Sequence, residues 1–254
     1  MKVTFLGTGT SQGVPVIACD CEVCLSQDKH DKRLRVSVLI EKEGKSIVID
    51  AGPDFRYQML RAGVRHLDAI LFTHEHKDHV AGLDDVRAFN FKQQSEIDVY
   101  ADMRVQSALK QEFHYIFSEA KYPGIPRLEL HEIKADQPFT VAGIEIIPIS
   151  VMHYKLPVFG FRIGDFTYIT DAKTIDKENI AKIRGSKIVV INALQKDSHI
   201  SHLTLDEAIS LAREIGAEQT YLTHISHRLG THVNVSKELP EGIQLAYDGL
   251  QLQM

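Results

Sequence analysis

Apolar residues recur along the chain in two patterns, and these patterns place the secondary structure. Continuous or alternating apolar runs predict strands at 3–6, 36–41, 46–50, 67–72, 97–100, 144–150, 159–163, 166–170, 187–193, 220–223 and within 243–252. Helical spacing of apolar residues predicts helices at 54–61, 80–91, 104–117 and 205–215. The chain therefore forms hairpins followed by alternating helices and strands, and it does so twice.

The clearest predicted loop, Tyr122–Pro126, lies near the middle of the chain. It divides a single expected domain, 1–254, into two similar halves at about 1–120 and 121–254. Because each half predicts hairpins and then alternating helices and strands, we expect an α/β fold. In this fold two mixed sheets pack face to face, and the helices lie outside them.

The overall composition suits one folded domain and excludes several classes of protein. With 254 residues, 44% hydrophobic and 25% charged, the chain can bury a sizeable core. Its formal net charge of −5 offers no basic field for nucleic acid, and no apolar run approaches the ~20 residues that span a bilayer. The chain begins with a predicted strand rather than an export leader, and three cysteines confined to 19–24 do not resemble a secreted disulfide framework. We therefore expect a cytoplasmic protein.

The segment 73–79 carries the pattern H-x-H-x-D-H between a predicted strand and a predicted helix. His74 and His76 are two residues apart, so an extended backbone points both imidazoles to one side. Asp78 and His79 open the helix, where adjacent side chains diverge by roughly 100°. The spacing therefore favours two metal ions, one bound by each pair. With 13 histidines and no tryptophan, the chain is rich in imidazole, which suits zinc and manganese-type ions.

Three later residues are candidates for the remaining ligands of such a pair of ions. They are His153, Asp171 and His224, and each follows a predicted strand. Taken singly, each is better explained as an ordinary loop residue. Their shared position after apolar strands favours a common site, because the loops that follow strands converge at the edge of a sheet.

Together these residues resemble the metallo-β-lactamase fold hydrolases over essentially the whole chain. The resemblance rests on Ile49-Asp50-Ala51-Gly52, on the H-x-H-x-D-H run and on the three later candidates, which occur in the family's order. It implies a four-layer αββα sandwich. It also implies two ligand sets, His74, His76 and His153 for one ion and Asp78, His79 and His224 for the other, with Asp171 bridging them. Asp50 is either a partner that hydrogen-bonds the ligand loop or a turn former at a strand end.

Two departures from other branches of this family narrow the chemistry. Antibiotic-cleaving members often place a cysteine in the second metal site, and here no cysteine lies near the later candidates. Oxygen-reducing di-iron members have a carboxylate where this chain has His76. A ligand set made only of His and Asp, with Asp171 as the bridge, looks like the phosphodiesterase branch.

Cys19, Cys21 and Cys24 form the pattern C-x-C-x-x-C, which places three soft metal ligands within one short segment. A structural zinc ion takes four ligands in a tetrahedron, and His227, which closely follows His224, is the candidate for the fourth. Free buried thiols or a redox pair are the alternatives. The cluster resembles one subfamily, the phosphoribosyl cyclic phosphate phosphodiesterases of the carbon–phosphorus lyase pathway. In that subfamily a histidine just after the last catalytic ligand completes the zinc site.

His202 lies between a predicted strand and a predicted helix, in the segment His199–Thr204. Thr204 and Glu207 predict a capping box at the start of that helix. The resemblance to the subfamily implies that His202 is a catalytic histidine that binds no metal. As an imidazolium it would stabilise the phosphate or protonate the leaving group. The alternative is that His202 is a solvated loop histidine. His199 is a weaker candidate for the catalytic role than His202.

The resemblance implies a dinuclear, metal-dependent phosphodiesterase in which a metal-bridging hydroxide attacks phosphorus. Its cofactors would be two divalent ions, Zn²⁺ or Mn²⁺, with one structural Zn²⁺. Asp78 is counted with His202 among the catalytic residues. The expected substrate is a small cyclic ribose or nucleotide-like phosphodiester, and no membrane partner is expected. A homodimer stays open, because relatives are often dimers.

Three alternatives remain beside this interpretation. A tRNA 3′-processing endonuclease of the same fold pairs the same ligand set with a late histidine, but such enzymes grip tRNA with a protruding arm. Nothing longer than 118–127 could serve as that arm here, so nucleic acid is the less favoured partner. A thioester or lactone hydrolase would apply the same metals to a carbonyl group. A metal-binding protein without turnover is disfavoured, because the ligand set is complete.

Overall fold

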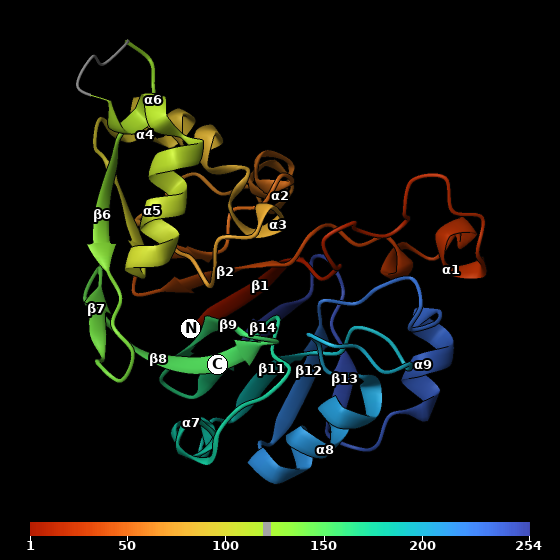
Figure 1. The fold of residues 1–254 in the computed structure, drawn as a ribbon. Coiled ribbons are helices and arrows are strands. Elements are labelled where there is room, and N and C mark those ends of the chain that lie inside the picture. The colour runs from red at the N-terminus through yellow and green to blue at the C-terminus, as the bar shows by residue number, and fades with distance from the viewer. Residues whose placement is uncertain (119–122) are drawn as a thin grey trace.

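The computed structural model describes residues 1–118 and 123–254, and in this range the chain forms two seven-stranded sheets (Figure 1). The first sheet contains, in spatial order, β14 (Gln251–Gln253), β1 (Lys2–Gly7), β2 (Ser37–Lys42), β3 (Lys45–Ile49), β4 (Ala69–Leu71), β5 (Ile97–Ala101) and β6 (Leu128–Glu132). The second contains β13 (Ile243–Leu245), β12 (Gln219–Thr223), β11 (Ile188–Asn192), β10 (Phe166–Tyr168), β9 (Leu156–Ile163), β8 (Ile144–His153) and β7 (Phe139–Val141).

The described residues also form nine α-helices and two 3-10 helices. The α-helices are α1 (Glu22–Leu25), α2 (Phe55–Ala62), α3 (Lys77–Val80), α4 (Arg87–Gln93), α5 (Met103–Glu112), α6 (His114–Phe117), α7 (Lys177–Ile183), α8 (Leu205–Ile215) and α9 (His232–Glu238). The 3-10 helices are η1 (Lys29–Asp31) and η2 (Leu83–Val86). Among these residues, no helix combines the length and the apolar character that a membrane span requires.

Both sheets are mixed, with an antiparallel half joined to a parallel half. In the first sheet the strands from β14 to β3 pair antiparallel and those from β3 to β6 pair parallel. In the second sheet the order is reversed, with β13 to β10 parallel and β10 to β7 antiparallel. The sheets match the two predicted halves only approximately. Both β6 and β14 come after residue 120 in the chain, yet they pair within the first sheet.

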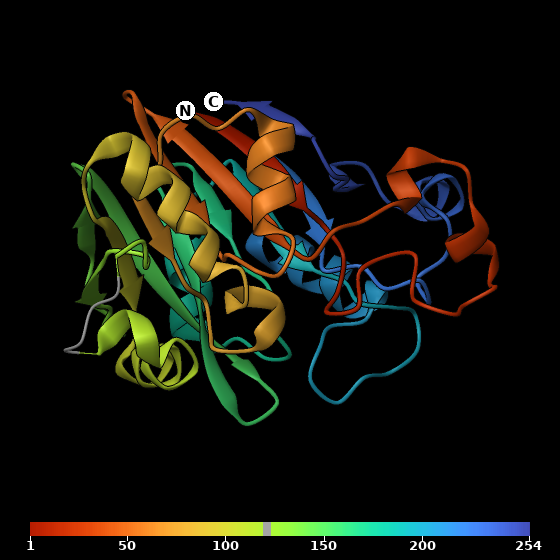
Figure 2. The same ribbon diagram turned by 90° about the horizontal axis from the view of Figure 1, so that it is seen from above.

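Three apolar clusters hold the layers together. The cluster between the sheets joins residues such as Phe5 of the first sheet to Phe161 of the second. On the outer face of the first sheet lie α2, α4 and α5, which contribute Phe55, Phe89 and Val105 to a second cluster. The helices α7, α8 and α9 contribute to the third cluster, on the outer face of the second sheet. The helices therefore lie outside the pair of sheets (Figures 1 and 2), which confirms the four-layer αββα sandwich.

Two of the predicted helices are wrong as continuous elements. In place of the predicted helix 80–91 the chain forms α3, η2 and α4. Gly82 lies at the first break, where a Cβ atom would come within 2.1 Å of the carbonyl oxygen of Gly52. The predicted helix 104–117 divides into α5 and α6 at Phe113. The short elements β6, β7, α7 and α9 are absent from the sequence prediction, because so few residues give no clear apolar period.

The predicted loop Tyr122–Pro126 begins at a residue that lies outside the described ranges, and Pro123 and Gly124 form a turn. The C-terminal segment forms strands on both sides of Asp248-Gly249, as expected, but the two strands belong to different sheets. The chain thus crosses from the second sheet back to the first at this turn.

Candidate metal centre

The predicted metal ligands meet at one edge of the two sheets, although they come from five separate segments. His74 and His76 follow β4, Asp78 and His79 lie in α3, His153 ends β8, Asp171 follows β10 and His224 follows β12. The strand β8 runs three residues past its predicted end at 150, so His153 is its last residue rather than part of the loop beyond. The rings of His74 and His79 have centroids 4.1 Å apart, and those of His76 and His153 are 5.2 Å apart.

Several residues at this edge, three of them in or beside the ligand set, have a backbone conformation that residues with a side chain seldom adopt. Asp50, Asp171 and His224 have φ angles of 63°, 57° and 54°. The left-handed region costs a residue with a side chain about 1–2 kcal/mol, so the surrounding structure must hold these turns in place. Backbone hydrogen bonds hold two of them. The amide of Asp50 donates to the carbonyl oxygen of Leu71, and the amide of Ile225, next to His224, donates to the carbonyl oxygen of Thr8, both at 2.9 Å. Such concentrated strain is typical of functional sites.

One group of ligand atoms forms around His79 and His224. The Nε2 atom of His79 lies 3.2 Å from Oδ2 of Asp78 and 3.3 Å from Oδ2 of Asp171. The Nε2 atom of His224 lies 3.2 Å from Oδ1 of Asp171. Ligands about 2.1 Å from a shared metal ion are about 3.0–3.4 Å apart, so these separations fit an ion. Both Nε2 atoms are buried, and neither makes a hydrogen bond within the described residues.

The other group contains His74, His76 and His153. Nε2 of His74 lies 3.0 Å from Nδ1 of His76. The Nδ1 atom of His153 is 3.0 Å from each of two carbonyl oxygens, those of Asp171 and Ser201. Because carbonyl oxygens only accept, this nitrogen carries the proton, and Nε2 of His153 is left free to bind a metal. Asp171 links the two groups, since one of its oxygens also lies within 4.8 Å of ligand atoms of His74 and His79.

Asp50 is a fully buried partner of the ligand loop as well as a turn residue. Its Oδ2 atom lies 2.7 Å from Nδ1 of His79, and its Oδ1 atom accepts a 2.9 Å hydrogen bond from the amide of Thr73. The contact with His79 holds the proton on Nδ1 and leaves Nε2 for the metal, which is how such partners orient metal-binding histidines. The structure therefore supports both interpretations of Asp50, as a hydrogen-bonding partner and as a turn residue.

The charges at the site suit divalent cations. Burial lowers the pKa of His74 well below its usual value, so this ring is neutral. Although burial opposes it, neighbouring histidines hold the pKa values of Asp78 and Asp171 well below their usual range. Burial also disfavours a charged His79, but Asp78, Asp171 and Asp50 outweigh it and raise the pKa of His79 well above its usual value. The site therefore holds charged carboxylates, and His79 carries a second proton, on Nε2, that a cation would displace.

Gly52 lets the loop after β3 pack directly against the ligand helix α3. A Cβ atom at this position would lie 2.0 Å from the carbonyl oxygen of Asp78. The neighbouring Ala51 accepts a hydrogen bond from the amide of Gly82 and donates one to the carbonyl oxygen of His79, at 2.9 and 2.8 Å. The Asp-Ala-Gly segment therefore fixes the start of α3 through close backbone contact.

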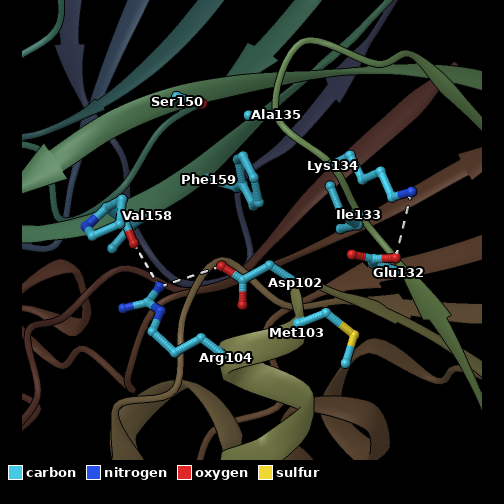
Figure 3. Close-up of a pocket in the computed structure, with 11 residues that line it drawn as sticks. Asp102, Met103, Arg104, Glu132, Ile133, Lys134, Ala135, Ser150, Val158 and Phe159 are labelled. Carbon is cyan, nitrogen blue, oxygen red and sulfur yellow. Dashed lines mark hydrogen bonds and ion pairs between the residues drawn. The ribbon is translucent and has the colours of Figure 1, made fainter.

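Arg104 also contacts the ligand loop, and no motif in the sequence indicates this contact. Its Nη1 atom lies 3.1 Å from Oε1 of Glu75, the residue between His74 and His76. Its Nη2 atom donates a 2.6 Å hydrogen bond to the carbonyl oxygen of Pro157. Figure 3 shows Arg104 beside Asp102 at one wall of a cavity of about 380 Å³. Arg104 thus ties the ligand loop to β9.

The four predicted zinc ligands lie together beside this centre. The Sγ atoms of Cys19, Cys21 and Cys24 are 3.2, 3.4 and 3.6 Å from Nδ1 of His227. The corresponding edges of a zinc tetrahedron are about 3.5 Å long, so the arrangement fits the ion. A hydrogen bond from the amide of Cys24 lowers the pKa of Cys21 to about 6, whereas burial raises that of Cys24 to about 11.

His202 lies within reach of both groups of ligands. Its ring centroid is 4.6 Å from that of His153 and 4.8 Å from that of His224, and its Nδ1 atom is 3.8 Å from Oδ1 of Asp171. The predicted capping box is confirmed: Thr204 and Glu207 hydrogen-bond reciprocally and fix the end of the loop that carries His202. Burial and then His224 lower the pKa of His202 to about 3. The ring is therefore neutral near pH 7 in the ligand-free site, rather than the expected imidazolium.

His199, the weaker candidate, lies farther out. Its ring centroid is 5.1 Å from that of His202, and its Nδ1 atom accepts a hydrogen bond from the amide of Ser201. The residue is half-buried, and the contact with Ser201 supports the loop.

Comparison with known families identifies the fold. The model of the beta-lactamase superfamily domain matches residues 45–225, a range that includes every candidate ligand of the His/Asp centre. The chain belongs to the beta-lactamase superfamily. A solved diphosphatase of the PhnP family is similar to this superfamily member at 41% identity and a TM-score of 0.93, over 100% of this chain and 97% of the other. This similarity supports the resemblance inferred from the motifs.

Curated relatives carry several different names. An octanoyltransferase of Porphyromonas gingivalis is 44% identical over 99% of this chain, but the match covers only 51% of that protein. The chain thus spans about half the length of the first curated relatives that it matches. A ribonuclease Z of Bradyrhizobium diazoefficiens is 26% identical over 89% of this chain and 90% of that protein. The human short-form tRNase Z, at 19% identity and a TM-score of 0.74 over 100% of this chain and 99% of the other, shows only that the fold is shared.

Proposed function

We propose that this superfamily member is a two-metal hydrolase of small phosphoric diesters or diphosphates. The observation that carries the proposal is the composition of the centre, in which only His and Asp side chains meet, with Asp171 between the two groups of histidines. The name of the PhnP-family neighbour, a diphosphatase at 41% identity, supports chemistry at phosphorus.

Seven side chains would hold the two ions, in the sets that the family resemblance implies. These are His74, His76 and His153 for one ion and Asp78, His79 and His224 for the other, with Asp171 shared. Divalent ions at such a site make hydroxide available near neutral pH and neutralise charge on the phosphoryl oxygens. Zn²⁺ and Mn²⁺ both suit the donor set. The converging buried Nε2 atoms of His79 and His224, without other hydrogen-bond partners in the described part of the chain, support this assignment.

The remaining residues orient the ligands and handle a proton. Asp50 holds the His79 proton on Nδ1, and the carbonyl oxygens of Asp171 and Ser201 do the same for His153. His202 is neutral in the ligand-free site, and an arriving phosphoryl anion raises the pKa of this ring. His202 then carries a proton that it can donate to the departing oxygen, a step usually worth about 10²–10⁴ in rate.

The Cys₃His cluster would hold a structural Zn²⁺ that orders the N-terminal loop beside the centre. His227 comes three residues after His224, so one short segment would serve both metal sites. The lowered pKa of Cys21 favours the thiolate form that zinc requires. A cytoplasmic location and a homodimer stay predictions that accompany this proposal.

The names of two relatives support alternative substrates. The ribonuclease Z of Bradyrhizobium diazoefficiens matches along nearly its whole length, which favours tRNA 3′-processing as the second candidate. The octanoyltransferase of Porphyromonas gingivalis supports thioester hydrolysis as a third candidate. Against tRNA stands the net charge of −5, which gives little attraction for a polyanion.

The proposal is tested by loading the purified protein with Mn²⁺ or Zn²⁺ and measuring nitrophenol release from bis(4-nitrophenyl) phosphate. A panel of cyclic nucleotides, diphosphate esters, a pre-tRNA and an octanoyl thioester follows. We expect turnover of small phosphoric esters that Asp171→Asn abolishes and that Asp165→Asn, at an exposed turn, leaves unchanged. Cleavage of the thioester or the pre-tRNA alone would refute the proposal.

A further inference from the structure

A cavity of about 460 Å³ opens directly beside the metal centre. One wall is formed by His76 and His153, two of the candidate ligands. The other walls come from two loops and the start of β9, and they consist of Tyr154, Lys155, Leu156, Ile200 and Ser201. A substrate whose phosphorus reaches the centre would therefore place its neighbouring group in this cavity.

The two loops around the cavity are the turn between β8 and β9 and the loop between β11 and α8. Figure 2 shows both projecting from the same side of the molecule. They are joined at the cavity floor, where Nδ1 of His153 lies 3.0 Å from the carbonyl oxygen of Ser201. The cavity walls are thus fixed to a metal ligand, so a group bound there has a defined position relative to the centre.

The rim of the cavity exposes large apolar side chains. Tyr154 is 52% exposed and Ile200 is 66% exposed. The ammonium group of Lys155 lies 5.3 Å from the centroid of the Tyr154 ring, which adds a positive charge at the same rim. Pockets for organic ligands are lined mainly by apolar and aromatic side chains with a few polar groups, so this rim next to the metal centre suits an organic ring attached to a phosphate.

Tyr154 is also held in an unfavourable backbone conformation. His153 pairs with Leu156, so Tyr154 and Lys155 form a two-residue turn. Such turns favour Gly, Asn or Asp at positions with positive φ, yet Tyr154 has φ of 56°. An aromatic residue at this strained position gives no visible packing benefit, because its ring is half exposed. A functional role for the ring accounts for both observations.

We propose that this cavity is a nucleobase subsite, in which the base of a nucleotide substrate stacks on Tyr154 and contacts Ile200. The inference rests on the proposed function, and it narrows the substrate to nucleotide esters or anhydrides rather than base-free sugar phosphates. Stacking on an aromatic side chain tolerates every base, since each has a π-face. The subsite therefore selects for the presence of a base and not for its identity.

The test compares the binding of adenosine 5′-monophosphate and ribose 5-phosphate by calorimetry, using the Mn²⁺-loaded protein. The two ligands share the phosphate and the ribose, so the ratio of their Kd values isolates the base. We expect the wild type to bind the base-bearing ligand about 10-fold more tightly, equivalent to about 1.4 kcal/mol. Tyr154→Ala should bring the ratio to within 2-fold of one, and Tyr154→Phe should retain it.

Tyr57→Ala is the matched control, because Tyr57 is 56% exposed on α2 and also has a cation, Arg61, 5.8 Å from its ring centroid. This variant should keep the wild-type ratio. A wild-type ratio near one, or a ratio unchanged by Tyr154→Ala, would overturn the subsite. Binding is measured separately from turnover, so the two proposals fail separately. Turnover with a ratio near one removes only the subsite, whereas a 10-fold ratio without hydrolysis of any phosphoric ester removes only the proposed function.

Discussion

Replacing Asp50 by asparagine tests how the buried carboxylate prepares His79 for a metal ion. The carboxylate lies 2.7 Å from Nδ1 of His79 and also accepts from the amide of Thr73. If the amide nitrogen of Asn faces His79, two donors meet, and the His79 proton must move to Nε2. If the amide group turns round, its nitrogen faces the amide of Thr73. The first arrangement weakens the metal site at His79 because a protonated Nε2 cannot bind an ion. The second weakens it because two donors then face each other at Thr73 and disturb the ligand loop.

The size of the effect follows from the hydrogen bond that is lost. A hydrogen bond to a charged group contributes about 1.5–3 kcal/mol, and each 1.4 kcal/mol corresponds to a factor of about ten. We therefore expect Asp50→Asn to raise the Kd of the ion at His79 about 10- to 100-fold, the range found for partners of metal-binding histidines. The Cys₃His site should keep its zinc, because Asp50 makes no contact with it.

The assay is a competition titration against a chromophoric chelator, combined with metal analysis of the dialysed protein. Asp54→Asn is the matched control, since Asp54 is a carboxylate on the same segment that accepts a hydrogen bond from the amide of Arg35 at 2.9 Å. This control should bind metal normally. Wild-type affinity for both ions in Asp50→Asn would refute the role of the carboxylate in fixing the His79 tautomer.

Three further predictions concern the centre. His202→Ala should lower kcat about 10²–10⁴-fold while the metal content, measured by mass spectrometry, stays normal; loss of metal would instead make His202 a ligand. The three carboxylate neighbours of His79 raise its pKa. In the metal-free protein the ring therefore carries a second proton, on Nε2, at pH 7. Calorimetry in buffers of different protonation enthalpy should therefore detect proton release on metal binding, and the metal affinity should fall as the pH falls; binding without proton release would contradict this. Arg104→Ala should weaken metal binding only about 2- to 5-fold, since a partly exposed ion pair contributes about 0.2–1 kcal/mol. In the same titration the control Arg213→Ala, at an exposed position, should have no effect. If both variants changed the metal affinity equally, the proposed role of the contact with Glu75 would be refuted.

The sequence predicted the parts of the site that depend on local spacing. The H-x-H-x-D-H run combines an extended segment with the start of a helix, and both determine where the side chains of His74 to His79 point. The Cys₃ cluster is similarly local, and the capping box at Thr204 follows from residues three apart. In each of these cases neighbouring residues fix the geometry, so the chain itself contains the information.

Contacts between distant segments could not be predicted in this way. The pairing of Arg104 with Glu75 needs α5 to lie against the ligand loop, and no spacing in the sequence encodes that placement. The subsite at Tyr154 and Ile200 needs two loops to meet across the second sheet. The break of the predicted helix 80–91 depends on the close approach of Gly82 to Gly52, which is a packing constraint rather than a local propensity.

Anomalous X-ray diffraction from crystals of the metal-loaded protein tests the central claim most directly, because it locates each ion. The proposal predicts two peaks about 3.5–4 Å apart, with Asp171 between them and His79 and His224 at one of them. A third peak, at the zinc edge, should lie among the three cysteines and His227. A single peak in the His/Asp centre, or peaks that Asp171 does not touch, would contradict the two-metal hydrolase proposed for this chain.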